Sequence, residues 1–354
     1  MLVPLLAVFT AIIIGGIVIA LVGGNPFAAY TGLFEGSFGS VKALSETAVW
    51  ASPYIFAGLA VALAFKGGLF NIGAEGQLAL GAVSSALVGY ALPGFLGVQL
   101  PMIIHLPLAV GAGMLFGFIW GAIPGALKAY TGAHEVINTI MMNYIALNLV
   151  SFLLNGPMKD KSPGNVIART PEIAEGARIP AIFAGLRVHW GFVLALLVAF
   201  LVWWLLWKTT LGYEIRTVGS NPDAAKYAGI NVKRIMTLTM ALSGMLAGLA
   251  GTIEVTALNY RHELGFSSGY GFDAIAIALL GKTHPLGVVL AAILFAAMRN
   301  GATRMQFLTQ IPVDIISVIQ ALILLFVAAD AIVRYIYRIR QSGDKVVLTR
   351  GWGG

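Results

Sequence analysis

The sequence predicts an all-α protein that crosses a membrane about ten times, with some of its spans short or broken. Hydrophobic residues make up 58% of the 354 residues and charged residues only 10%, whereas soluble domains carry roughly 25% charged residues. Many of the apolar residues form runs of about 20, the length that an α-helix needs to cross the hydrocarbon core. The 43 glycines suit close contact between helices in lipid. We therefore expect one membrane domain over residues 1–340 and a short cytoplasmic tail over 341–354.

Ten apolar segments are predicted as spans. They cover residues 2–22, 47–65, 69–91, 102–127, 135–155, 190–207, 235–256, 271–281, 285–299 and 312–333. The first is too long for a signal-peptide core and lacks a small-residue cleavage site, so it is interpreted as a retained span. The runs 271–281 and 285–299 are short for full spans, and KTHP separates them. Two readings stay open for this pair, half-helices or a hairpin.

Basic residues at the ends of these spans predict that both termini face the cytoplasm. Lys66, Lys128 and Lys208 fall on the cytoplasmic side in this arrangement, as does the segment 211–234. The loop 156–189 is then external. Its basic residues do not follow the rule, but long loops are weak evidence for orientation. Arg299 and Arg304 also come out external and remain unexplained.

Two apolar segments, LFNIGAEGQLALGA at 69–82 and GYGFDAIAIALLGK at 269–282, contain glycines and polar residues and are faintly similar to each other. Paired, interrupted spans of this kind are typical of transporters built from two repeated halves around a substrate pathway. The pattern therefore favours a transporter with pseudo-repeat halves.

The sequence gives little support for an enzyme, a metal site or a nucleic-acid-binding protein. AIALLGKT at 276–283 has Ala276 where a phosphate loop needs its first glycine. His134 and Glu135 begin a zinc-protease pattern, but position 138 is Asn138 instead of the second histidine. There is no cysteine, and the net charge of +7 is spread over short basic stretches at helix ends. We predict no catalytic residue, no metal site and no nucleic-acid partner.

The segment LGYEIRTVGSNPDAAKYAGINVKR, residues 211–234, is a polar island between two apolar runs. Asn221 and Pro222 predict a helix start, with Asp223 near the positive end of the helix dipole, and Gly229 predicts its end. A short capped helix on the cytoplasmic side is of a size to dock in a groove of another protein. An ordinary solvated loop is the alternative reading.

Asp223, Ala224, Ala225 and Gly229 form the pattern D-A-A-x-x-x-G, which resembles the E-A-A-x-x-x-G coupling-loop signature in permease subunits of ATP-binding-cassette importers. The wider string GYEIRTVGSNPDAAKYAGI resembles the branched-chain amino acid and ribose type permease family. Together with GLFNIGAEGQLALGA at 68–82 and AHEVINTIMMNYIALNLV at 133–150, it is similar to the nucleoside branch of that family. The resemblance covers roughly residues 40–335. Asp223 departs from the more general Glu, but a shorter carboxylate also caps a helix well.

The resemblance implies a multi-pass subunit of the bacterial cytoplasmic (inner) membrane that imports a small polar solute, with nucleosides as the first expectation. It would pair with a second permease, identical or related, in the lipid bilayer. Cytoplasmic ATP-binding subunits would hold ATP and Mg, while this chain binds no cofactor. An extracytoplasmic binding protein, periplasmic or lipid-anchored, would deliver the solute by docking on loops such as 23–46 and 156–189. The residues expected at the coupling site are Arg216, Gly219, Asn221, Pro222, Asp223, Ala224, Ala225, Lys226, Tyr227 and Gly229.

Polar residues within the spans are candidates for the translocation pathway, because leaving them in lipid is costly. Aromatic rings are added because nucleobases stack on them. The candidates are Asn71, Glu75, Gln77, Glu135, Asn138, Asn143, Tyr144, Glu254, Phe272 and Asp273. For the amides, bridging between helices is an equally good reading. Asn71 and Glu75 are about one turn apart and are expected to share one face of a cavity.

Three alternatives stay open at this point. A simple-sugar permease of the ribose type is the runner-up within the family, and a flavin-like heterocycle is a further substrate. An ion-coupled secondary transporter is the rival from another class, with Glu75, Glu254 and Asp273 as its proton or sodium groups.

Overall fold

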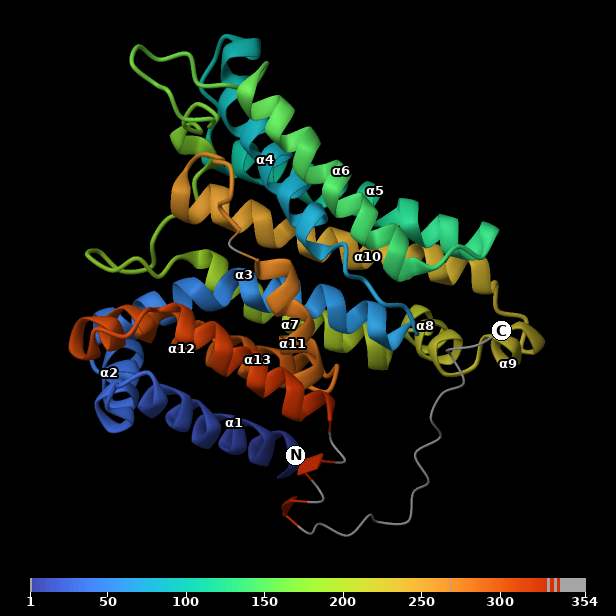
Figure 1. Cartoon of the computed structure of the whole chain (residues 1–354). Helices are drawn as coiled ribbons and strands as arrows, with labels where there is room; N and C mark the ends of the chain where they lie inside the picture. The colour runs from blue at the N-terminus through green and yellow to red at the C-terminus, as the bar shows by residue number, and fades with distance from the viewer. Residues whose placement is uncertain (1, 268, 330–331, 334–335, 338–354) are drawn as a thin grey trace.

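The structure, a computed structural model, describes residues 2–267, 269–329, 332–333 and 336–337. The predicted tail 341–354 lies outside these residues. The described part is almost entirely helical (Figure 1), and its β-structure is limited to two isolated bridges, Arg169 with Glu263 and Ala181 with His189.

The helices follow the chain in an order close to the predicted one. They are α1 (Leu2–Leu21), α2 (Pro26–Phe38), α3 (Val41–Lys66), α4 (Ala74–Leu96), α5 (Met102–Thr131), α6 (Glu135–Asn155), the short η1 (Glu175–Ala177), α7 (Trp190–Lys208), α8 (Thr210–Ser220), α9 (Pro222–Tyr227), α10 (Val232–Ile253) with its π-helical continuation η2 (Glu254–Asn259), α11 (Tyr270–Leu280), α12 (Pro285–Thr309) and α13 (Asp314–Ala328). Each of the ten predicted spans corresponds to one of these helices. Among the described residues, eight helices are long and apolar enough to cross a membrane, and α11 and α13 are shorter apolar helices.

Two sequence-based expectations are corrected by the structure. Segment 23–46 is not a loop, because Asn25 caps a 13-residue helix, α2, by accepting hydrogen bonds from the Phe27 and Ala28 amides at 3.0 and 3.3 Å. The run predicted to end at residue 299 continues as helix α12 to Thr309. Arg299 therefore lies inside a full-length helix, where the sequence placed the end of a short one.

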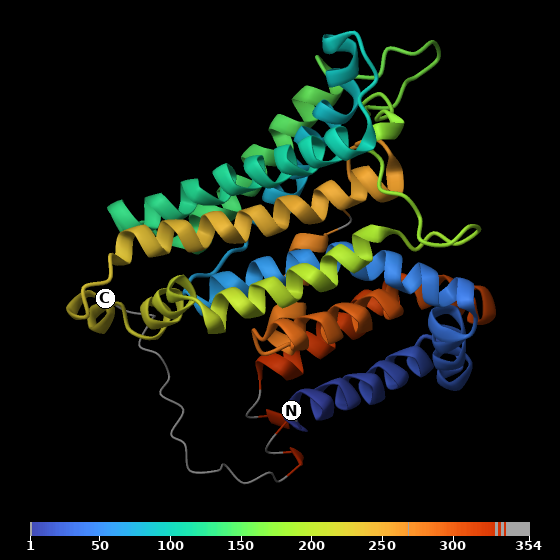
Figure 2. The same cartoon turned by 180° about the vertical axis from the view of Figure 1, so that it is seen from behind.

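Helix α3 is the centre of the bundle, and every one of its residues from Ala51 to Ala64 is buried. In both views of the whole chain, α4, α5, α6 and α10 form one group of helices, and α1, α7, α11, α12 and α13 lie on the other side with α3 between the groups (Figures 1 and 2). The α5–α10 contact is close because glycines face each other: a Cβ atom at Gly117 would collide with the Gly244 carbonyl oxygen. Small residues of this kind let helix backbones approach in a membrane.

Helices α4 and α11 begin inside the bundle. After α3 ends at Lys66, residues 67–73 turn back along it, and Asn71 and the Ala60 carbonyl both contact the Ser243 hydroxyl. Because an α-helix rises 1.5 Å per residue, this level is about 9 Å inside the end of α3. Asp273, in the first turn of α11, bonds to Tyr54, which lies close to the middle of α3. The two interrupted segments predicted from sequence are therefore spatial neighbours at their helix starts.

Candidate functional site

The polar island forms two helices at one end of the bundle, next to the last turn of α7 (Figure 1). Thr209 caps α8 by accepting a hydrogen bond from the Gly212 amide at 3.1 Å. The Arg216 side chain donates from Nε to the Leu206 carbonyl at 2.9 Å and so fastens α8 to α7. Gly219 lies against the backbone at the end of α3, where a Cβ atom would collide with the Lys66 carbonyl oxygen. Helix α8 is thus held against the ends of two spans.

Helix α9 is the predicted short helix, and it begins at Pro222 as expected. Asn221 accepts a hydrogen bond from the Ala224 amide at 3.0 Å, and Gly229 has a φ of +82°, a left-handed conformation that suits glycine after a helix end. Ala225 is completely buried within this chain, so it anchors α9.

The outer surface of α9 is solvent-exposed. Tyr227 is 94% exposed, and with Asp223 and Lys226 it borders a surface pocket of about 510 Å³. Ala224 is exposed beside them. The structure therefore presents Asp223, Ala224, Lys226 and Tyr227 outward, while Arg216 and Ala225 hold the segment in place. That these residues contact an ATPase stays a prediction.

A second polar site lies at the start of α11, in the middle of the bundle. Tyr54 donates a hydrogen bond to Asp273 Oδ2 at 2.7 Å, and the Arg299 guanidinium donates to the Tyr54 hydroxyl at 2.9 Å. Arg299 and Asp273 Oδ2 are 3.7 Å apart. The same guanidinium lies over the rings of Trp50 and Tyr270, at 5.0 and 5.4 Å from their centroids. Cation–π contact and the carboxylate together stabilise a charge that would be costly in lipid.

A cavity of about 640 Å³ opens beside this site, between α11, α12 and α13. Its lining includes Asp273 and Phe272 from the predicted pathway, with Trp50, Arg299 and Gln320 as residues that the sequence reading missed. The missed basic residue did leave a signal. Arg299 is an isolated charge that contradicted the predicted orientation, and a charge that does not fit a helix end is a candidate for the interior.

Glu75 joins the two interrupted helices. Its Oε2 atom accepts a hydrogen bond from the Gly271 amide at 2.7 Å, and its Oε1 atom accepts one from the Ser267 hydroxyl. Gly271 lies so close to the backbone of Glu75 that a Cβ atom there would not fit. A carboxylate at the first turn of a helix interacts favourably with the helix dipole. Glu75, in the first turn of α4, thus caps the start of α11.

Three of the candidate amides bridge helices within the core. Asn71 bonds to Gln77 and to Ser243, both at 2.8 Å, and Asn143 accepts from the Gly76 amide and donates to the Ile72 carbonyl at the same distance. Asn71 and Glu75 have different partners, and neither of them lines the cavity beside Asp273. Of the two readings for these amides, the structure supports bridging.

The remaining candidates lie apart from the cavity. Glu135 forms an ion pair with Lys128 at 3.0 Å at the start of α6, near Asn138. Tyr144 is 62% exposed on the outer face of α6. Glu254 is buried at the start of η2, where its Oε2 atom accepts a long hydrogen bond of 3.4 Å from Asn259.

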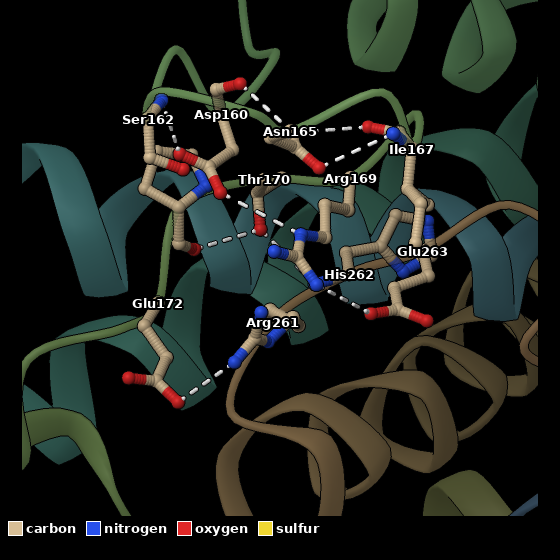
Figure 3. Close-up of polar contacts among 11 residues, drawn as sticks. Asp160, Ser162, Asn165, Ile167, Arg169, Thr170, Glu172, Arg261, His262 and Glu263 are labelled. Carbon is tan, nitrogen blue, oxygen red and sulfur yellow. Dashed lines mark hydrogen bonds and ion pairs between the residues drawn. The ribbon is translucent and has the colours of Figure 1, made fainter.

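The loop 156–189 is joined to the connection 260–269 at the opposite end of the bundle from α9 (Figures 1 and 3). Thr170 and His262 exchange two hydrogen bonds, at 2.9 Å from the Thr170 amide and 3.0 Å from the His262 amide. Arg261 pairs with Glu172 at 3.0 Å, and Arg169 lies 4.0 Å from Glu263. These contacts connect the exposed loop to the chain that leads directly into α11.

Charge and burial shift the pKa values of two groups in this cluster. The Ser162 amide and the Arg169 guanidinium lower the pKa of Asp160 below its usual 3.8. Burial lowers the pKa of His262 to about 3, because the protonated ring would be charged away from water.

Comparison with known proteins gives consistent matches. Residues 43–328 match the family described as branched-chain amino acid transport system, permease component. The guanosine ABC transporter permease NupP of Bacillus subtilis is 39% identical over 97% of this chain and 97% of its own length. The nucleoside ABC transporter permease NupB of Lactococcus lactis is 36% identical over 94% of this chain and 92% of its own. A glucose ABC transporter permease of Haloferax volcanii is 35% identical over 97% and 90%. No solved structure matches the chain.

Proposed function

The chain belongs to the branched-chain amino acid transport system permease family, and on this premise we propose that it is the membrane-spanning subunit of an ATP-binding-cassette importer of nucleosides. The observation that carries this proposal is the 39% identity to a guanosine permease over 97% of both chains. The nucleoside permease at 36% supports the same substrate class. A glucose permease at 35% keeps sugars as the competitor that an experiment has to separate.

Membership of this family implies partners in general terms, an ATPase and a substrate-binding protein. The ATPase subunits bind ATP and Mg and dock on the exposed face of α9. Because Arg216 and Gly219 hold α8 tightly against α7 and α3, a displacement of α9 is transmitted to the spans. A second permease completes the pathway in the bacterial cytoplasmic membrane, and the binding protein docks on the loop 156–189.

The first test is uptake of labelled guanosine, glucose and ribose in cells that express the chain with its neighbouring ATPase and binding protein. We expect ATPase-dependent guanosine uptake. Tyr227→Ala removes a side chain that is 94% exposed, so folding is preserved while the interface loses an aromatic anchor. Because such anchors dominate interface energy, co-purification of the ATPase should weaken about tenfold or more.

Phe95→Ala is the matched control, since Phe95 is 88% exposed near the end of α4, remote from α9. It should leave ATPase binding unchanged. Uptake of sugar instead of guanosine would overturn the proposal that nucleosides are the substrate. Guanosine uptake that needs an ion gradient and no ATPase would return the ion-coupled alternative.

A further inference from the structure

The cavity between α11, α12 and α13 extends along α13. Its lining on α13 extends from Asp314 to Leu324, which corresponds to about 15 Å along the helix. Asp314 begins α13, and the cavity end there also includes Thr303 of α12. The neighbouring Asn300 bonds to Thr47 at 3.0 Å, near the start of α3, where Ser45 accepts a hydrogen bond from Val188 of the loop 156–189. The cavity therefore leads from the end that carries this loop to Asp273 in the middle of the bundle.

The lining combines aromatic surface with hydrogen-bonding groups. Phe272 is 52% exposed, so a large part of its ring is free for contact, and Trp50 contributes a second ring. Ser317 and Gln320 add a hydroxyl and an amide on the α13 wall. The volume of about 640 Å³ falls in the range of roughly 300–1,000 Å³ that is usual for small-molecule sites.

The Asp273 carboxylate is fixed in position with one oxygen to spare. Tyr54 and Arg299 both contact Oδ2, so Oδ1 remains able to accept a hydrogen bond. Carboxylates accept bonds and do not donate them when ionised. A ligand that offers an N–H group next to a flat ring therefore matches both Asp273 and Phe272.

We propose that this cavity is a transit site for nucleosides, in which the base stacks on Phe272 and donates an N–H group to Asp273, while Arg299 is a positioning residue for that carboxylate. This inference rests on the proposed function and adds a site and a selectivity to it. The ribose hydroxyls would meet Ser317 and Gln320. Bases with N–H donors, such as guanine, are favoured over a base without them.

The site is tested by photolabelling the complete transporter, with its ATPase, in lipid nanodiscs with 8-azidoguanosine and mapping the labelled peptides by mass spectrometry. Label is expected on α11, α12 or α13. Guanosine should compete better than purine riboside, whose base has no N–H donor, and ribose alone should compete poorly. In Asp273→Asn, the donors Tyr54 and Arg299 hold the amide oxygen at the present Oδ2 position, so the NH2 group, which cannot accept a hydrogen bond, faces the ligand. The change should therefore weaken competition by guanosine about tenfold and should remove the preference over purine riboside.

Glu35→Gln is the matched control, because Glu35 is also an ion-paired carboxylate, 3.5 Å from Arg304, but lies on α2 and does not line the cavity. Its labelling should equal that of the unchanged protein. Asp273→Asn could fail to fold, since it weakens the contact with Arg299. In that case Phe272→Leu tests the site, because the half-exposed ring of Phe272 contributes little to folding. This variant should weaken competition by guanosine and by purine riboside alike.

A wrong site and a wrong function would give different experimental results. If the transporter takes up guanosine but label falls only on other helices, or if both variants label as the unchanged protein does, the site is wrong and the proposed function stands. If ribose or glucose displaces the label better than guanosine does, or if nucleoside uptake is absent, the proposed function itself is wrong.

Discussion

Arg299 shows how a single charge is kept inside this membrane protein. Its guanidinium contacts Tyr54, Asp273 and the faces of Trp50 and Tyr270. Side chains from three helices, α3, α11 and α12, thus meet at one residue. Because an unpaired charge in this environment is costly, removing only Arg299 or only Asp273 is expected to destabilise the protein more than removing both.

Replacing Arg299 with Gln should lower the free energy of unfolding by about 3 kcal/mol, since Asp273 would be left as a partly buried carboxylate without its counter-charge. The combined Arg299→Gln, Asp273→Asn variant should be more stable than Arg299→Gln alone. Thermal unfolding of the purified protein in one detergent measures both. Equal midpoints for the unchanged protein and Arg299→Gln would show that the pair contributes nothing to folding.

At the scale of elements, glycines decide how α5 and α10 pack. Gly113, Gly117 and Gly121 are spaced four residues apart on α5. Gly117 and Gly121 lie against the backbone of α10 at Gly244 and Gly248, and Gly113 lies against the Thr252 side chain of α10 and the Gly81 carbonyl of α4. Residues at this spacing share one helix face. The absence of side chains along this face lets the two backbones touch, and it puts α10 in position to contact α3 and α4.

Gly117→Ala should destabilise the protein by about 1–3 kcal/mol, the usual cost of overpacking. The new Cβ atom would collide with the Gly244 carbonyl oxygen, and this backbone atom can move away only if α5 and α10 separate. Gly111→Ala, on the same helix, is the control. A Cβ atom at Gly111 meets nothing within 4 Å, so the change should be neutral or slightly stabilising. Equal unfolding temperatures for the two variants would contradict the packing argument.

Over the whole molecule, the contacts of the loop 156–189 connect it to the interior. The loop 156–189 is bonded to η2 through the Ile179 amide and the Thr256 carbonyl at 2.8 Å, and to the connection 260–269 through Thr170 and His262. That connection ends at α11, whose start carries Asp273. A displacement of the loop, such as the docking of a binding protein that we propose, would therefore reach the cavity through a short, continuous set of contacts.

This connection is expected to loosen in acid. Burial lowers the pKa of His262 from 6.5 to about 3. Between pH 6.5 and pH 3, His262 therefore takes up a proton when the loop is open and stays neutral when the loop is closed. The closed form is therefore fully stable above pH 6.5 and loses stability as the pH falls toward 3. Asp160 contributes little at pH 5, because its usual pKa of 3.8 in an opened loop and its lower pKa in the closed loop both leave it ionised there.

Hydrogen exchange of the 260–269 peptide, corrected for the intrinsic pH dependence of exchange, should be faster at pH 5 than at pH 7.5. His262→Phe should remove the difference, because Phe does not titrate and keeps the ring contact with Phe266, whose centroid is 4.5 Å away. His189 has a pKa lowered to about 4 by burial and by Arg187, so the peptide around it is scored separately. An acid response that persists in His262→Phe would assign the effect to another group.

The sequence by itself determined the membrane class, the ten apolar helices, the short helix at Pro222 and the resemblance to ABC permeases, because hydropathy, capping residues and motifs act over a few turns of chain. It also identified the two interrupted segments as a pair. It did not identify α2, since a 13-residue helix with little apolar run looks like a loop, and it ended α12 ten residues early because Arg299 interrupts the apolar run.

Only the tertiary structure decided which polar residues share a site. Asn71, Glu75 and Asp273 have similar local sequence surroundings, yet Asn71 bridges helices, Glu75 caps α11 and Asp273 lines a cavity. Their partners Ser243, Gly271 and Arg299 lie far away in the chain, and no local pattern specifies which helix faces meet. The pairing of charges and the presence of a cavity are properties of packed helices, so helix contacts and crossings decide them and no single segment does.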